Sequence, residues 1–269
     1  LLRQMSRGIG QLTNNALPTV TSFNLMPVPM FLLMGEIFFH TGLANKMFSA
    51  VDRLMGRIPG RLSFVTVAGG TAFATLSGSS LGATALLGSL MVPEMQKRGY
   101  KKHMAIGPIL GTGGLAMLIP PSALAVLLAT LANLDVGKLL IAGVVPGLML
   151  AGFYVILILG MCLWDPEAAP SYEVDKSTLV EKLKLLFFDV LPMMSIVVGV
   201  ILLILNGWAT PSESAAFGCL GVLALAILYG KLTWEGFKNS VNGALKVTTM
   251  ALLIIFGSAT FSQLLAFSG

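Results

Sequence analysis

Small polar residues interrupt an otherwise apolar stretch of this chain, residues 62–95. The run Ser77-Gly78-Ser79-Ser80 offers hydroxyl groups and, where the backbone is unwound, carbonyl oxygens. Such oxygens are the ligands that sodium and other alkali cations prefer. We therefore expect an ion or substrate site at this run, with Na⁺ near Ser77, Ser79 and Ser80. The alternative interpretation is that small residues only allow membrane helices to pack closely.

A second candidate set lies in the apolar span 103–130. Glycines loosen its first half, and consecutive prolines remove two backbone donors at mid-depth. In membrane transporters, a discontinuous helix beside a helical hairpin places helix ends and freed carbonyls around a cation and an anionic substrate. The alternative is a proline kink that only shapes packing. The candidate binding residues of this span are Gly113, Gly114, Pro120, Pro121 and Ser122.

Three further patterns could carry chemistry. Glu36 is an acid inside an apolar span and is either functional or hydrogen-bonded to a neighbouring helix. Thr210-Pro211-Ser212-Glu213 is typical of a capping box that starts a helix, whose exposed amides can also attract anions. The G-x-S-x-G pattern at 78–82 would suit a hydrolase only between a strand and a helix. Both of its flanks read as membrane helices, so we expect no enzymatic activity.

The elements that must position these residues follow from length and charge. As one helix, residues 62–95 would run about 51 Å, against a hydrocarbon core of roughly 30 Å. Short basic loops tend to stay cytoplasmic, and basic residues flank this stretch on both sides. Both ends therefore lie on one face, which predicts a re-entrant hairpin with the serine run at its turn. The flanking residues are Arg53, Arg57, Arg61, Lys97, Arg98, Lys101 and Lys102.

Composition sets the protein class. The mean hydropathy is +0.86, 55% of residues are hydrophobic and 11% are charged, against about 25% charged in soluble domains. The sequence therefore predicts an all-α polytopic membrane protein embedded in a lipid bilayer. The net charge of +5 arises mainly from short loops and reports orientation, so we expect no nucleic-acid partner. Cys162 and Cys219 lie in apolar segments without metal-ligand spacing and are expected to be buried.

The apolar pattern predicts six crossings and one re-entrant element. The predicted cytoplasmic loops are 44–61, 96–102, 163–187 and 230–240, which hold 13 of the 17 Lys and Arg residues. The crossings are expected at about 25–43, 103–130, 139–162, 188–206, 211–229 and 241–267.

Three regions follow from this topology. Residues 1–163 form a first membrane region, with the hairpin 62–95 and the broken helix 103–130. Residues 164–187 form a cytoplasmic linker with an amphipathic stretch along the membrane surface. Residues 188–269 begin a second membrane region.

A weak internal similarity suggests inverted repeats. Gly35 and Phe39 resemble Gly257 and Phe261 in a span of opposite direction, although chance similarity explains two positions equally well. The chain starts at Leu1 and ends at Gly269 in or after an apolar run, so we expect it to be part of a longer protein.

Five segments together resemble one transporter family. They are PVPMFLLMGEI at 27–37, FATLSGSSLGATALLGSLMVPEMQKRGY at 73–100, LIPPS at 118–122, AGVVPG at 142–147 and GWATPSESAA at 207–216. In this order they are similar to the large membrane (M) subunit, DctM-like, of tripartite ATP-independent periplasmic (TRAP) transporters.

The resemblance implies a sodium-driven, elevator-type importer in the bacterial inner membrane. Its substrate would be a small organic acid such as a C4-dicarboxylate or sialic acid, with Na⁺ as coupling ion and no organic cofactor. Its partners would be a small four-helix membrane subunit and a periplasmic substrate-binding protein. For this sequence, the resemblance implies that the serine turn and the broken helix contribute to a sodium site. It also implies that Thr210, Pro211 and Glu213 form a second-half motif.

The chain departs from the family pattern at Ala116, where glycine is frequent, and the second hairpin expected by analogy would lie beyond Gly269. The alternatives are an elevator carrier that works without a binding protein, a passive channel and a membrane scaffold.

Overall fold

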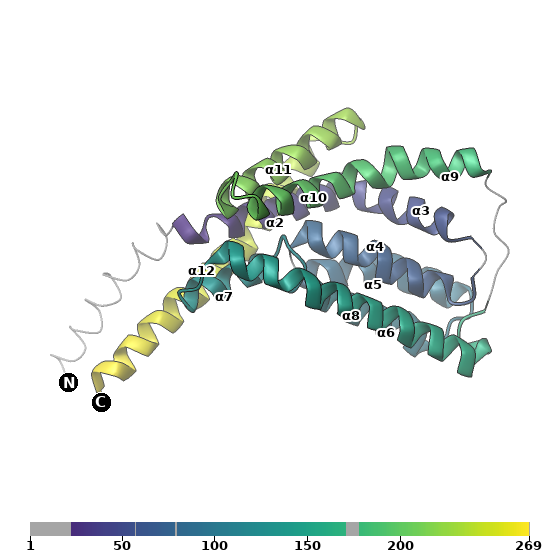
Figure 1. The fold of residues 1–269 in the computed structure, drawn as a ribbon, viewed down its shortest axis with the longest axis horizontal. Coiled ribbons are helices and arrows are strands. Elements are labelled where there is room, and N and C mark those ends of the chain that lie inside the picture. Colours follow the sequence, from purple (N-terminus) through teal and green to yellow (C-terminus); the bar gives the residue numbers. More distant parts are fainter. Residues whose placement is uncertain (1–22, 57, 79, 171–177, 269) are drawn as a thin grey trace.

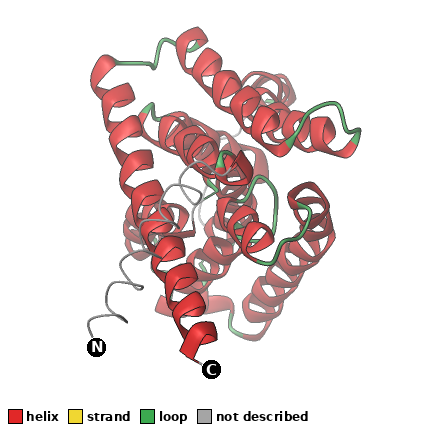
Figure 2. Cartoon of the chain, turned by 90° about the vertical axis from the view of Figure 1, so that its left-hand side faces the viewer, coloured by secondary structure: helices red, strands yellow, loops and turns green. Residues whose placement is uncertain are grey.

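The computed structural model describes residues 23–56, 58–78, 80–170 and 178–268, and this part of the chain contains helices and loops but no strand (Figure 2). Five helical stretches within it are long and apolar enough to cross a membrane. The predicted all-α polytopic membrane protein is thereby confirmed. The helices are η1 (Phe23–Leu25), α2 (Pro27–His40), α3 (Leu43–Met55), α4 (Arg61–Ser77), α5 (Ser80–Lys97), α6 (Lys102–Leu115), α7 (Ala123–Leu131), α8 (Val136–Trp164), η2 (Pro166–Ala168), α9 (Leu179–Leu185), η3 (Leu186–Val190), α10 (Leu191–Leu205), α11 (Pro211–Leu228) and α12 (Trp234–Ser268).

Helix α2 lies at the centre of the bundle (Figure 1). It packs against α11 and α12 on one side and against α4, α7 and α3 on the other. Its apolar side chains are largely buried, and Phe31, Met34 and Phe38 are fully enclosed. The helix starts at Pro27. The N–H of a first helical residue has no bonding partner within the helix, so proline loses no hydrogen bond at this position. This helix therefore connects the hairpin to the later membrane helices.

Helix α3 corrects the sequence-based expectation of a loop at 44–61. Leu43, Met47 and Phe48 are buried, whereas Asn45 and Arg53 are exposed, as in an amphipathic helix. The charged residues of this segment indicated a loop, but they occupy only the outer face of a helix. Its inner face packs on α4.

Helices α4 and α5 form the predicted helical hairpin. With 17 and 18 residues, each arm is about 26 Å long, which is shorter than the roughly 30 Å hydrocarbon core. Almost every residue of α4 is buried; Ala68 is the exposed one. Its packing against α2, α3, α5, α6 and α8 makes this arm part of the core. That the hairpin re-enters the membrane stays a prediction.

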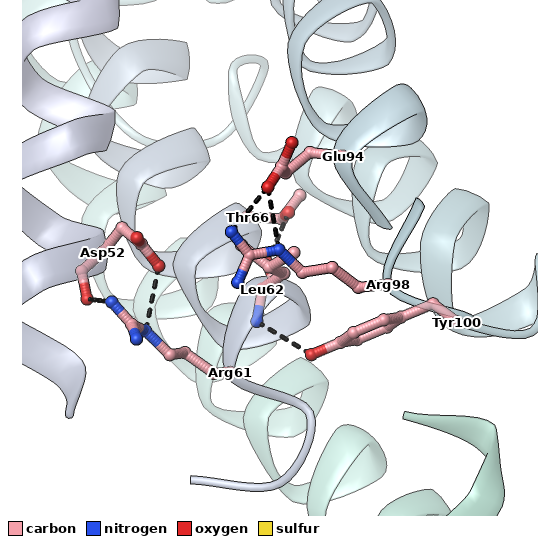
Figure 3. Close-up of polar contacts among 7 residues, drawn as sticks. All are labelled: Asp52, Arg61, Leu62, Thr66, Glu94, Arg98 and Tyr100. Carbon is pink, nitrogen blue, oxygen red and sulfur yellow. Dashed lines mark hydrogen bonds and ion pairs between the residues drawn. The ribbon is translucent and has the colours of Figure 1, made fainter. Parts of the chain in front are cut away.

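Charged residues fix the base of the hairpin (Figure 3). The guanidinium of Arg61, only 3% exposed, places Nε 2.9 Å from Oδ1 of Asp52, and its Nη2 donates to the Asp52 carbonyl. The Tyr100 hydroxyl accepts from the Leu62 N–H at 3.3 Å. Burial raises the pKa of the Asp52 carboxyl, and Arg61 opposes that shift. The Asp52–Arg61 pair therefore fixes where α3 meets α4 rather than adding large net stability.

The span expected to be a broken helix consists of two helices, α6 and α7, separated by residues 116–122. Helix α8 follows α7 in the chain. It exposes large apolar residues such as Phe153 and Ile156, which suits a lipid-facing surface.

The amphipathic stretch expected along the membrane surface is continuous with the helix that follows it, and its location at the surface stays a prediction. Helices α9, η3 and α10 form one helical stretch from 179 to 205, with a π-helical turn at η3. Lys46 lies 2.9 Å from Asp189 in this turn and 3.7 Å from the centre of the Tyr229 ring, and the Tyr229 hydroxyl donates to the Phe188 carbonyl. These contacts tie α3 and the end of α11 to the turn. The sequence pattern of 179–187 could not reveal these distant partners.

We expect Arg61→Met to lower the free energy of unfolding by about 2 kcal/mol, because it leaves the half-buried Asp52 carboxylate without its cation. The measurement is thermal unfolding of the purified protein in detergent. Arg53→Met, which removes an exposed arginine from the same region, should change stability little. Equal effects of the two variants would show that the Asp52–Arg61 pair does not fix the base of the hairpin.

Candidate ion and substrate site at the hairpin turn

The turn of the hairpin has left-handed backbone at Gly78, with φ of +57°. Helix α4 ends at Ser77, the Gly78 N–H donates to the Ala74 carbonyl at 3.1 Å, and α5 begins at Ser80. A left-handed residue that closes a helix is most readily glycine, which has no Cβ to clash. Ser77 is buried, and its hydroxyl donates to the Ala74 carbonyl at 3.3 Å. The predicted ligand Ser79 lies outside the described residues.

The turn lies directly against the interruption between α6 and α7. A Cβ built on Gly78 would be 3.5 Å from the Pro121 carbonyl oxygen and 3.5 Å from the Ala123 amide nitrogen. It would lie equally close to Phe31 of α2. The structure thus brings together the two sequence segments that were predicted to form one site.

The interruption itself is built around prolines. The Pro120–Pro121 peptide is cis, and Pro120, Pro121 and Ser122 are buried. The Ser122 hydroxyl donates to the Met117 carbonyl at 3.0 Å and accepts the Ala125 N–H at 3.2 Å. A continuous helix would have offered that carbonyl the N–H of residue 121, which proline lacks. The Ser122 hydroxyl therefore provides the hydrogen bond that Pro121 cannot give to the Met117 carbonyl, and Ser122 starts α7 as its N-cap.

Four helix ends meet here. The last carbonyls of α4 and α6 give these helix ends a partial negative charge, whereas the first amides of α5 and α7 give the helix starts a partial positive charge. Carbonyl ends suit a cation, and amide ends suit a carboxylate. The candidate oxygen ligands among the described residues are the Pro121 carbonyl and the hydroxyls of Ser77 and Ser122, both already bonded to backbone carbonyls.

The two glycines predicted in α6 have different environments. A Cβ on Gly113 would overlap Oγ1 of Thr84 and lie 3.5 Å from the Ser80 carbonyl oxygen, so only glycine lets α6 approach the start of α5. A Cβ on Gly114 would meet nothing within 4 Å. The sequence could not separate them, because both glycines look the same without their neighbours.

Sequence reasoning missed Gly35. A Cβ on this residue would overlap the Ser77 backbone, so α2 touches the end of α4 closely only because Gly35 is glycine. The weak internal similarity pairs Gly35 with Gly257, but a Cβ on Gly257 would meet nothing within 4 Å. The next residue, Glu36, lines a pocket of about 330 Å³ beside the turn.

The second-half motif lies at a different place. Thr210 and Glu213 form the predicted capping box: the Glu213 carboxylate accepts the Thr210 N–H at 2.8 Å, and Thr210 Oγ1 accepts the Glu213 N–H at 3.3 Å. Thr210 and Pro211 line another pocket of about 270 Å³, together with the start of α8 at Val136. The structure therefore does not bring these residues to the hairpin turn, and helix initiation accounts for their pattern.

Comparison with known proteins identifies relatives over nearly the whole chain. The family model "Tripartite ATP-independent periplasmic transporter, DctM component" matches residues 4–269. The chain is 31% identical to the C4-dicarboxylate TRAP transporter large permease protein of Rhodobacter capsulatus, over 93% of this chain and 59% of the relative.

Two other relatives carry different substrate names. The chain is 27% identical to the sialic acid TRAP transporter large permease protein of Vibrio cholerae, over 99% of this chain and 61% of that protein. It is 28% identical to the 2,3-diketo-L-gulonate TRAP transporter large permease protein of Escherichia coli, over 87% of this chain and 54% of that protein. The chain thus spans little more than half the length of these relatives.

We expect Gly113→Ala to destabilise the protein by about 1–3 kcal/mol, since its methyl group would overlap Thr84 Oγ1 and push α6 from α5. Gly114→Ala is the matched control: its methyl group enters open space, and alanine favours helix by about 1 kcal/mol. Thermal unfolding of both variants checks this contrast. If Gly113→Ala were as stable as Gly114→Ala, the close contact of α6 with α5 would be contradicted.

Proposed function

Because the chain belongs to the DctM family of tripartite ATP-independent periplasmic transporter components, we propose that it is part of a secondary transporter that imports a small organic acid together with sodium. Members of this family are multi-pass proteins of the inner membrane, and the five apolar helices agree with that location. The family is one of transporter permeases and not of enzymes.

One observation supports the sodium proposal most strongly: the hairpin turn at Gly78 touches the break before Ala123. Two interrupted helices that meet at one point bring backbone carbonyl oxygens and serine hydroxyl oxygens close together. Oxygens of this kind, held by rigid helix ends, suit a small monovalent cation. The amides that start α5 and α7 would in turn favour a carboxylate nearby.

The substrate class rests on the relatives. The three relatives described above are named for a C4-dicarboxylate, sialic acid and 2,3-diketo-L-gulonate, which are all organic acids. Among the described residues, no Arg or Lys side chain lines the pocket beside the turn. A carboxylate at this site would therefore bind through serine hydroxyls and helix-start amides, together with parts of the longer protein.

The remaining parts of the mechanism follow from family membership. We propose that a small four-helix membrane subunit and a periplasmic binding protein complete the transporter, and that the binding protein delivers the acid. Alternating access would occur by an elevator movement of the hairpin and broken helix against the other helices. Sodium and substrate would together favour the moving state, which couples uphill import to the sodium gradient.

We predict that sodium raises the melting temperature of the full-length protein relative to choline at equal ionic strength, because a ligand that binds only the native state stabilises it. Gly35→Ala should raise the half-saturating sodium concentration about fivefold or more, since its methyl group displaces Ser77 at the turn. Ser79→Leu should act in the same direction, because it replaces a predicted oxygen ligand with an apolar side chain.

The control is Gly88→Ala in α5, whose methyl group would meet nothing within 4 Å and should leave the sodium response unchanged. A wild-type protein without any sodium-specific shift would argue against ion coupling and favour a channel or a scaffold. A sodium shift equal in all variants would place the ion away from the hairpin turn.

A further inference from the structure

Glu36 is a charged residue inside the central membrane helix α2, one turn before its end at His40. A carboxylate in this position is costly unless it serves a function or has a partner. Its side chain is 26% exposed, and it lines the pocket beside the hairpin turn. The other lining residues are Gly35, Phe39, Phe73, Ser77, Gly82, Ala85, Leu86 and Ser89.

Within the described part of the chain, Glu36 is the one charged side chain that lines this pocket. The pocket reaches Ser77 at the end of α4 and Ser89 on α5, which offer neutral hydroxyls. Neutral oxygens coordinate a cation but leave its charge uncompensated, and an uncompensated charge is unfavourable in a low-dielectric interior. A nearby carboxylate supplies the missing negative charge.

Contacts with α12 and with His40 hold this carboxylate in place. On α12, a Cβ built on Gly243 would lie 2.5 Å from Glu36 Oε2 and 2.7 Å from its Cδ, so the carboxyl group occupies the space that glycine leaves. The Ser240 hydroxyl donates to the Glu36 backbone carbonyl at 3.1 Å. His40 Nε2 lies 3.3 Å from Oε2, one turn further along α2.

We propose that the Glu36 carboxylate provides the counter-charge for a monovalent cation bound in the pocket beside the hairpin turn. This inference rests on the proposed sodium coupling and adds a residue from α2 to a site otherwise built from α4–α7. It assigns Gly243 of α12 a positioning role, because a methyl group at this position would force the carboxyl group to move. Through Glu36, the occupancy of the pocket depends on the packing of α12 against α2.

The test is a sodium titration of the melting temperature of the full-length protein, with choline holding the ionic strength constant. Glu36→Gln keeps the shape and removes the charge, and we expect the half-saturating sodium concentration to rise about tenfold. Glu36→Asp keeps the charge on a shorter side chain and should give a smaller rise. Gly243→Ala should raise the concentration because its methyl group displaces the carboxylate.

Two matched controls separate charge and packing effects. Glu235→Gln removes an exposed acid from the first turn of α12, and Gly257→Ala adds a methyl group on α12 where nothing lies within 4 Å. Both should leave the half-saturating concentration unchanged, whatever they do to the melting temperature in choline.

The outcomes distinguish this inference from the proposed function. If wild-type protein responds to sodium and Glu36→Gln responds at the same concentration, Glu36 is only a structural partner of His40 and α12, and the inference is overturned. If wild-type protein shows no sodium response, the proposed sodium coupling fails and this inference fails with it. If Glu36→Gln does not fold, the contrast between Gly243→Ala and Gly257→Ala decides the question.

Discussion

Non-helical backbone at membrane depth must be enclosed by protein, because lipid cannot satisfy its polar groups. In this protein, neighbouring helices enclose the non-helical interruption between α6 and α7. The hairpin turn covers the interruption through Gly78. From another direction, α8 covers it where Cβ atoms on Gly143 and Gly147 would overlap Leu118 and Ile119. Residues Ile119 to Ser122 are consequently buried.

Glycine determines how close the covering helices come. Gly35 lets α2 reach the end of α4, and Gly113 lets α6 reach the start of α5. Each contact brings backbone near backbone or near a hydroxyl, which concentrates helix ends in a small volume. The same close packing that stabilises a membrane bundle without a hydrophobic driving force between helices also gathers the polar groups of the candidate site.

Two different interactions fix the two ends of the hairpin. Its turn is fixed by glycine packing against the break and α2, whereas its base is fixed by Arg61 and Asp52, with Tyr100 bonded to the first turn of α4 (Figure 3). Charged pairs cost less free energy at the base because part of the cluster is exposed, whereas the turn carries only small neutral residues. Glu36 is the exception near the turn, and it stands where α12 has no side chain at Gly243. The helices around the Glu36 side chain leave room for its charged carboxyl group.

The sequence by itself determined the membrane class, the hairpin arms, the break at Pro120–Pro121 and the capping box at Thr210, because apolar length, proline and capping chemistry act locally. It could not reveal that α3 is a helix, since the charged residues of that segment occupy one outer face. It also could not show that 179–205 is one helical stretch. Only the tertiary structure showed that Gly113 is in close contact with α5 while Gly114 is not, and that Gly35 packs against the Ser77 backbone. It also showed that Thr210 lines a different pocket from the one beside the hairpin turn. These outcomes depend on which helices touch, and contacts between residues far apart in the chain leave no periodic signal in the sequence.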